Sequence, residues 1–368
     1  MTNSGTKMET RRRRSGQFSL SQKLRKPRET DLLQQRLPVW NPMLTPINTA
    51  PFFFGFSVIS ALLGLLLNST SRNIVEFEID YTGTDPLSPC YSCAKNYSRT
   101  STTLCTCSVA FTLDKAFKGN VYMYYGLSNF FQNHRRYLKS RDDAQLNGEP
   151  WALKNPSSRC EPYQRDGGLP IAPCGAISNS LFNDTLRLYR VDSTGTKTEV
   201  SLVKKDIAWW TDKHLKFKNP PGNKNLSLLF EGTNQPPNWR KPVYELDPSD
   251  PGNNGFMNED LIVWMRPAMS ANFRKLYRII PGLDNRPTLP QGAYVLDVAY
   301  NFPVISFGGR KRMILSTMSW MGGKNPFLGL AYITMGVVLF LLAVIFLMVH
   351  LVCGTSSRFL EVPHTAAA

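Results

Sequence analysis

The chain has 368 residues, and its 43 Lys and Arg against 27 Asp and Glu give a formal net charge of +16 at pH 7. This length allows one large domain with its own hydrophobic core, or two small ones. Such a positive charge would suit a nucleic-acid-binding protein. However, two uncharged apolar segments near the ends of the chain indicate that most of the chain, with much of its positive charge, lies on the far side of a membrane. We therefore expect no nucleic-acid partner.

The first 46 residues form a basic tail, with ten Lys and Arg against three acidic residues. Residues 1–33 have almost no apolar periodicity, so we expect no packed structure there. The run from Arg11 to Arg14 could bind anionic membrane lipid, or it could serve only to orient the chain. The next stretch could anchor at the membrane interface or contact the cytoplasmic part of a partner; its residues are Gln35, Arg36, Leu37, Pro38 and Trp40.

Two segments, residues 47–67 and 327–353, contain no Asp, Glu, Lys or Arg. A bilayer core requires about 20 apolar residues in a helix, so each segment predicts a transmembrane helix. The first could instead be a cleaved signal peptide, but it follows a long basic extension and lacks an obvious cleavage site. Ser57 with Ala61, and Ser60 with Gly64, are small residues four positions apart. They favour close packing against another membrane protein; the alternative is ordinary helices that face lipid or pack on each other.

Lysine and arginine near the spans predict the orientation, because cytoplasmic flanks carry the positive charge. The basic tail predicts a cytoplasmic N-terminus. With two spans, residues 354–368 form a second cytoplasmic tail and residues 68–326 form an exoplasmic domain. Four basic residues on the exoplasmic side of the second span oppose this orientation, namely Arg310, Lys311, Arg312 and Lys324. We keep the cytoplasmic N-terminus because the first helix usually dominates.

Short apolar segments separated by Pro, Gly and Asn turns follow the first span. They predict a large, mainly antiparallel β domain with few helices, flanked by the two transmembrane helices. The expected strands are residues 73–81, 108–113, 120–125, 185–191, 260–265 and 292–300. The expected helices are residues 127–140 and 272–280. We expect Trp209 and Trp264 in the hydrophobic core.

Six of the seven cysteines lie between the two spans, at Cys90, Cys93, Cys105, Cys107, Cys160 and Cys174. The first four could bind zinc, but the second pair of this cluster is too closely spaced for a typical zinc site. An even number of cysteines in an oxidising compartment favours three disulfides. Short local pairs are the simplest arrangement, although six cysteines permit 15 connectivities. The seventh, Cys353, is either an ordinary residue at the membrane edge or a palmitoylation site.

Four Asn-x-Ser/Thr sequons occur, at Asn68, Asn96, Asn183 and Asn225. Such sequons accept N-linked glycans in exoplasmic domains. Asn68 lies too close to the first span, so glycans are expected on the other three.

The sequence contains no Walker A loop, no G-x-S-x-G and no H-E-x-x-H motif. Its four histidines do not cluster, and the acidic stretch 247–260 lacks the spacing of a calcium-binding loop. We therefore expect no catalytic, metal-binding or cofactor-binding residues, and no enzyme.

Several long strings, in order along residues 34–352, resemble one family. They are QRLPVW (35–40), IDYTGT (79–84), VYMYYGLSNF (121–130), NHRRY (133–137), SRDD (140–143), IAPCG (171–175), IAWWTD (207–212), NED (258–260), VWMR (263–266) and SWMGGKNPF (319–327). The chain resembles the cell cycle control protein fifty, or ligand-effect-modulator, family.

The resemblance implies an accessory beta subunit of P-type ATPase lipid flippases, which helps the catalytic alpha subunit to fold, leave the endoplasmic reticulum and translocate aminophospholipids. It implies residence in the endoplasmic reticulum, Golgi, secretory vesicles and plasma membrane. It also implies the disulfides Cys90–Cys107, Cys93–Cys105 and Cys160–Cys174, and a glycan on Asn183. Relatives carry sequons where this chain has Ala110 and Asp297, so its glycan positions should differ. The alternative function is a cell-surface receptor or adhesion glycoprotein.

Overall fold

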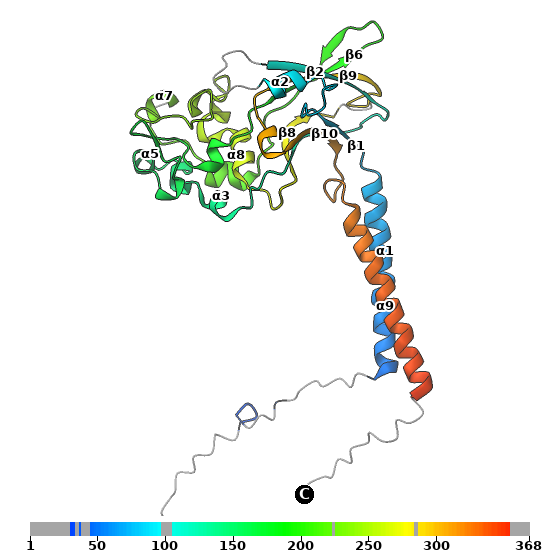
Figure 1. The fold of residues 1–368 in the computed structure, drawn as a ribbon. Coiled ribbons are helices and arrows are strands. Elements are labelled where there is room, and N and C mark those ends of the chain that lie inside the picture. The colour runs from blue at the N-terminus through cyan, green and yellow to red at the C-terminus, as the bar shows by residue number, and fades with distance from the viewer. Residues whose placement is uncertain are drawn as a thin grey trace, which may run out of the picture. The chain divides into compact units, whose positions relative to one another are not determined.

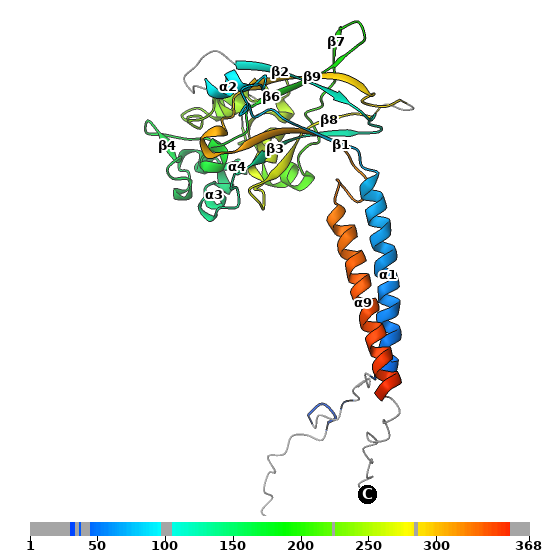
Figure 2. The ribbon, with the colours of Figure 1, turned by 45° about the vertical axis from the view of Figure 1, so that its right-hand side comes forward.

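The computed structural model describes residues 30–33, 37, 45–96, 105–222, 225–282 and 286–353 (Figures 1 and 2). The chain divides into two compact units. The larger unit is Phe53–Leu342, and the smaller one contains the remaining ends of two long helices, residues 46–52 and 343–353.

The two long helices are α1 (Pro46–Arg72) and α9 (Pro326–Cys353). Each is long and apolar enough to cross a membrane. At 1.5 Å per residue, each measures about 40 Å, which exceeds the hydrocarbon core of a bilayer by about 10 Å. Helix α1 continues beyond residue 67, the predicted end of the first span, and its last residue, Arg72, is its only charged one.

Residues 73–325, which we call the β domain, contain two four-stranded antiparallel sheets. The first sheet has the order β1 (Glu76–Asp80), β10 (Arg310–Thr317), β3 (Val121–Ser128) and β8 (Phe273–Ile280). The second has the order β2 (Cys105–Leu113), β9 (Gly292–Tyr300), β6 (Thr185–Val191) and β7 (Lys197–Glu199). A small hairpin pairs β4 (Arg165–Asp166) with β5 (Leu169–Pro170).

Alternating apolar residues from both sheets form one hydrophobic core. On β9, the buried side chains alternate with less buried ones along the strand; they are Tyr294, Leu296, Val298 and Tyr300. Aromatic rings connect the sheets: Phe77 of β1 stacks on Phe111 of β2 with 4.8 Å between ring centroids. The antiparallel β domain flanked by two apolar helices confirms the predicted fold class.

Short helices occupy the connections, and none described in the β domain exceeds seven residues. The α-helices are α2 (Tyr91–Lys95), α3 (Arg135–Lys139), α4 (Asp143–Leu146), α5 (Pro150–Lys154), α6 (Ala176–Asn179), α7 (Leu226–Leu229) and α8 (Glu259–Met265). Single 3-10 or π turns are η1 (Ser158–Cys160), η2 (Asp212–Lys216), η3 (Val243–Glu245), η4 (Pro251–Asn253), η5 (Gly255–Met257) and η6 (Ile305–Phe307). In Figure 1, α3, α5, α7 and α8 lie together to the left of the strands.

Two expected elements were assigned the wrong type. Residues 260–265, predicted as a strand, form α8, whose first N–H groups are capped by Asn258: its Oδ1 accepts the N–H of Leu261. Glu259 and Asp260 then place acidic side chains in the first turn, where the helix dipole favours negative charge. Residues 272–280, predicted as a helix, form β8, because the segment completes the first sheet by pairing with β3.

The helix predicted over residues 127–140 is also wrong over most of its length. Strand β3 continues to Ser128 and pairs with β10. The next residue, Asn129, has a φ of 57°, a left-handed conformation that ends the strand. Phe130 then packs against the core, and only α3 is helical in this stretch.

Candidate functional site

The two long helices pack against each other through small residues, which we call the helix seam. A Cβ atom built on Gly64 of α1 would lie only 2.7 Å from the backbone nitrogen of Ile333 of α9. A Cβ atom on Gly329 of α9 would lie 2.7 Å from the nitrogen of Asn68. Ser57, about two helical turns before Gly64 on α1, is also buried. These small residues therefore allow close packing within the chain, which was one of the two alternatives left open by the sequence.

The faces of both helices that point away from the helix seam carry large apolar side chains. They include the exposed residues Phe56, Leu62, Leu65, Val337 and Leu341. These faces are suited to lipid or to the helices of another membrane protein.

The core of the β domain contains an ion pair between Lys311 of β10 and Asp184, which directly precedes β6. Lys311 Nζ lies 2.6 Å from Asp184 Oδ2, and neither side chain is exposed. The same Nζ donates to the carbonyl oxygen of Phe302 at 2.7 Å, and the hydroxyl of Tyr81 donates to Asp184 at 3.3 Å. Asp184 Oδ1 accepts the backbone N–H groups of Asn301 and Phe302. Burial lowers the pKa of Lys311 to about 8, although Asp184 acts in the opposite direction.

The sequence did not predict this buried pair. It identified Arg310, Lys311 and Arg312 only as basic residues flanking the second span. In the structure Arg310 pairs with Asp80 at 2.9 Å and Arg312 with Glu78 at 2.7 Å, so all three contribute to ion pairs within the β domain. Their positive charges are therefore locally compensated.

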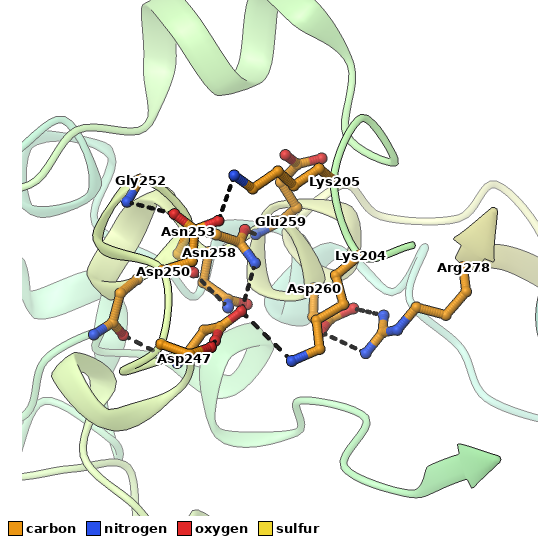
Figure 3. A network of polar contacts seen from close by, with 12 residues as sticks. Lys204, Lys205, Asp247, Asp250, Gly252, Asn253, Asn258, Glu259, Asp260 and Arg278 are labelled. Atoms are coloured by element: carbon orange, nitrogen blue, oxygen red, sulfur yellow. Dashed lines mark hydrogen bonds and ion pairs between the residues drawn. The ribbon is translucent and has the colours of Figure 1, made fainter. Parts of the chain in front are cut away.

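A second polar cluster lies around the loop that precedes α8 (Figure 3). Asp247 accepts hydrogen bonds from Ser249 Oγ at 2.6 Å and Asn253 Nδ2 at 3.0 Å, and Lys204 Nζ lies 3.6 Å away. Burial opposes ionisation of Asp247, but these hydrogen bonds and the Lys204 ammonium hold its pKa below the ordinary value. These contacts connect the loop before α8 to Lys204.

A cavity of about 530 Å³ lies beside this polar cluster. Its wall includes Asn183, Lys204, Trp239, Tyr277, Arg278 and Asn301. Arg278 donates to both carboxylate oxygens of Asp260, at 2.6 and 3.1 Å, which holds its guanidinium in one orientation. In the part of the chain that the structure describes, the buried Oδ1 atoms of Asn183 and Asn301 have no hydrogen-bond partner. The cavity wall therefore offers acceptors to a polar ligand.

Lys275 of β8 is buried, and its ammonium hydrogen bonds within the described residues go to backbone carbonyl oxygens. Its Nζ donates to the carbonyl oxygens of Val263, Trp264 and Arg266, at the end of α8. These carbonyls are among the last ones of the helix, which lack partners within it. Burial, together with the nearby charge of Arg266, lowers the pKa of Lys275 to about 7.

The two tryptophans expected in the core have different environments. Trp264 is fully buried and donates from Nε1 to the carbonyl of Ile177 at 2.8 Å. Trp209 is 65% exposed and Trp210 is 66% exposed, so the expectation for Trp209 was wrong. The guanidinium of Arg266 stacks over the ring of Trp209 at 4.1 Å, which holds the indole at the surface.

A second cavity, of about 580 Å³, has a wall formed by Arg266, Asp212 and Leu215, among other residues. Leu215 is exposed. The ring of Trp210 packs against His214, the residue before Leu215. We call Trp209, Trp210 and Leu215 the exposed aromatic patch. Exposed aromatic side chains beside a concave surface are typical of protein interfaces.

Three disulfides connect the cysteines between the helices. Cys90–Cys107 encloses Cys93–Cys105, and Cys160–Cys174 is separate. This is the pairing that the family resemblance implies. Cys353 is free and exposed. Among the described residues, no three His, Cys, Asp or Glu side chains are grouped as metal ligands.

Comparison with known proteins identifies the family. The model of the LEM3 (ligand-effect modulator 3) family / CDC50 family matches residues 67–356. The chain belongs to this family. It is 59% identical over 329 residues to cell cycle control protein 50A of Bos taurus, covering 89% of this chain and 90% of that protein.

More distant family members also match over nearly the whole chain. Cell cycle control protein 50B of Homo sapiens is 50% identical, covering 88% of this chain and 93% of that protein. ALA-interacting subunit 3 of Arabidopsis thaliana is 38% identical, covering 92% of this chain and 90% of that protein. The match to the CDC50 family and the two apolar helices together support a membrane protein.

The predicted glycosylation residues lie in different settings in this CDC50 family member. Asn96 is exposed directly after α2, and Asn183 lies in the wall of the 530 Å³ cavity. Asn225 is exposed and caps α7, since its Oδ1 accepts the N–H of Ser227.

Of the predicted N-terminal contact residues, Leu37 is exposed. Gln35, Arg36, Pro38 and Trp40 lie outside the described residues, so their predicted contact with a partner stays a prediction.

Proposed function

We propose that this chain is a non-catalytic accessory subunit of a P-type ATPase that translocates phospholipids. In this role it supports the folding of the catalytic subunit, its exit from the endoplasmic reticulum and its transport activity. Membership of the CDC50 family supports this role, and the name of the plant relative describes a subunit that interacts with another protein.

The helix seam is the observation that carries this proposal. Helix α1 has no charged residue before Arg72, and α9 contains no Asp, Glu, Lys or Arg; its titratable side chains before Cys353 are Tyr332 and His350. A path for a charged lipid headgroup requires polar or ionisable groups, or interrupted helices, within the membrane. Because these two helices pack closely on each other through glycine, the path would have to be supplied by a partner protein.

The proposed topology follows from the charge of the tail. Ten basic residues before the first span favour a cytoplasmic N-terminus, which makes residues 354–368 cytoplasmic and residues 68–326 exoplasmic. Three disulfides and three sequons in the β domain agree with an exoplasmic position. In this topology Asn96, Asn183 and Asn225 carry N-linked glycans, and the chain passes through the endoplasmic reticulum and Golgi to secretory vesicles and the plasma membrane.

Two surfaces are proposed to contact the ATPase. The exposed aromatic patch offers two large indole rings, and tryptophan and arginine are enriched among the residues that contribute most to binding. On the cytoplasmic side, Arg36 and Trp40 shortly precede the first span in the sequence, and we propose that they contact the same partner.

Co-expression tests the proposal. Expressed alone, the chain should be retained in the endoplasmic reticulum with glycans that remain sensitive to endoglycosidase H. Expressed with a catalytic ATPase subunit, both proteins should reach the cell surface and co-purify in detergent. Equal surface levels in both conditions would contradict the proposal and favour a receptor or adhesion protein.

A further inference from the structure

All three residues of a glycosylation sequon line the cavity beside the polar cluster. Asn183, Asp184 and Thr185 form the sequon, and Asn183 lies in the cavity wall. The sequon is held firmly, because Asp184 is the acidic partner of the buried Lys311. Asn301 adds a hydrogen bond from its Nδ2 to the carbonyl oxygen of Asn183 at 3.3 Å. A sugar attached here would start from a fixed position.

The unpaired atoms of the wall indicate what the cavity can hold. Asn301 is only 7% exposed, and in the described part of the chain its buried Oδ1 has no hydrogen-bond partner. Its Nδ2 donates to two carbonyl oxygens, those of Asn183 and Ala299, so the orientation of the amide is defined. The Oδ1 of Asn183 is a second unpaired buried acceptor. A buried acceptor without a partner is unfavourable, so a ligand with O–H or N–H donors would be favoured.

Carboxylates compensate part of the positive charge of the wall, since Lys204 lies next to Asp247 and Arg278 is paired with Asp260. Arg240 and Lys241 also belong to the wall. Trp239 and Tyr277 add aromatic surface to the same wall. Acceptor groups combined with aromatic rings suit a sugar, which has hydroxyl and amide donors and an apolar ring face. An anion without O–H or N–H donors would leave the Oδ1 atoms of Asn183 and Asn301 without partners.

We propose that the first sugars of the glycan on Asn183 occupy this cavity and complete the hydrogen bonding of Asn183 and Asn301. The volume of about 530 Å³ lies within the usual range of small-ligand pockets, about 300–1,000 Å³. Because the sugar is tethered to the wall, its effective concentration is in the millimolar range or above, and weak contacts are enough to hold it. The glycan then acts as an internal part of the β domain. This inference rests on the proposed exoplasmic position of the domain.

Deglycosylation of the native protein tests the inference. The purified full chain is treated with peptide-N-glycosidase F, and the occupancy of each sequon is followed over time by mass spectrometry. The glycan on Asn183 should be released about tenfold more slowly than an exposed glycan, since the enzyme can act only when the sugar leaves the cavity. Denatured protein should lose all glycans at similar rates.

A control glycan on the hairpin that follows Asn183 makes the comparison direct. Thr194→Asn creates a sequon with Gly195 and Thr196 in the exposed turn between β6 and β7. Lys204→Ala removes a side chain from the cavity wall and should accelerate release from Asn183. Lys205→Ala, at a neighbouring residue that is absent from the wall, should leave the rate unchanged.

The outcomes separate the two proposals. If no sequon carries a glycan, including the one created by Thr194→Asn, the exoplasmic topology itself is wrong. If the Thr194→Asn sequon is glycosylated but Asn183 is not, or if both glycans are released at the same rate from native protein, only the cavity inference is overturned.

Discussion

Lys311 and Asp184 connect the two sheets of the β domain through an ion pair of 2.6 Å from which solvent is excluded. Lys311 belongs to β10 in the first sheet, and Asp184 directly precedes β6 in the second. Tyr300 of β9 lies against the ammonium, with its ring centroid 3.2 Å from Nζ. Removing one member of such a pair leaves a buried charge without compensation, whereas removing both does not.

The first prediction concerns this pair. Lys311→Met should lower the free energy of unfolding by about 3–5 kcal/mol, because Asp184 then keeps an uncompensated charge. Adding Asp184→Asn should restore at least about 1 kcal/mol, since the charge is gone and the amide oxygen can still accept the N–H groups of Asn301 and Phe302. Chemical unfolding of the purified chain in detergent measures both. The exposed pair of Arg310 with Asp80 provides the control, and Arg310→Ala should cost less than about 1 kcal/mol. Strictly additive effects of the two core substitutions would contradict the coupling.

The second prediction concerns the nested disulfides. Cys90–Cys107 and Cys93–Cys105 close almost the same loop, with sequence separations of 17 and 12. While one of them is intact, the unfolded chain is already constrained, so removing the other by paired Cys→Ser substitutions should cost little loop entropy. Removing both disulfides should lower the free energy of unfolding by about 3 kcal/mol more than the sum of the two single removals. Cys160–Cys174 closes a separate loop. In thermal unfolding measurements, the destabilisation caused by removing it should therefore add to that caused by removing either of the other two. Equal, additive costs for all three disulfides would contradict this account.

The third prediction concerns the helix seam. Gly64→Leu should separate α1 from α9, because the backbone of Ile333 leaves no room for even a Cβ atom. Gly55→Leu is the matched control in the same helix, since nothing lies within 4 Å of a Cβ atom there. In a Cys353→Ser background, cysteines replacing Phe54 and Phe340, whose rings lie 6.2 Å apart, should be joined by a short thiol crosslinker. Crosslinking should be lost with Gly64→Leu and kept with Gly55→Leu; equal yields would contradict close packing at Gly64.

The strands that the sequence predicted correctly are those whose alternation is decided locally. Residues 185–191 and 292–300 coincide with β6 and β9 because their apolar residues alternate and turns bound them. The errors occurred where local patterns compete. The apolar side chains of residues 260–265 fit the periodicity of a helix as well as that of a strand. Only the Asn258 cap and the acidic first turn that follows it distinguish α8 from a strand. Strand β8 depends on pairing with β3, which is about 150 residues earlier in the chain and lies beyond any local pattern.

The site residues show the same division. Lys311 shares a strand face with Met313 and Leu315, a pattern that indicates burial once the strand is identified. Its partner Asp184 gives no such signal, because the contact spans 127 positions. Trp209 could not be distinguished from Trp264 by residue type, since its exposure depends on where the loop before η2 lies against Arg266.

The fourth prediction concerns Lys275 and pH. Its pKa is about 7 in the folded protein against 10.5 ordinarily, with burial as the main cause. Between these values the folded state binds fewer protons than the unfolded chain, so Lys275 makes the free energy of unfolding rise with pH. The free energy of unfolding of the wild-type protein, relative to that of Lys275→Met, should therefore rise by up to about 1.4 kcal/mol per pH unit above pH 7. Below pH 7 this difference should not change with pH. Unfolding from pH 6 to 9 measures this difference. A constant difference would mean that the three carbonyl acceptors keep the ammonium protonated.

The fifth prediction concerns the exposed aromatic patch. Replacing Trp209 and Trp210 by alanine should change the free energy of unfolding by less than about 0.5 kcal/mol per residue, because both side chains are mostly exposed. The same substitutions should reduce recovery of the chain with its ATPase partner in detergent at least about tenfold, since a buried tryptophan at an interface can contribute 2 kcal/mol or more. Trp151→Ala is the matched control, as this tryptophan is equally exposed but lies on α5, outside the patch. Unchanged recovery of the double variant would exclude the patch as a contact surface. A loss shared by Trp151→Ala would instead indicate that removing any surface tryptophan disturbs the complex.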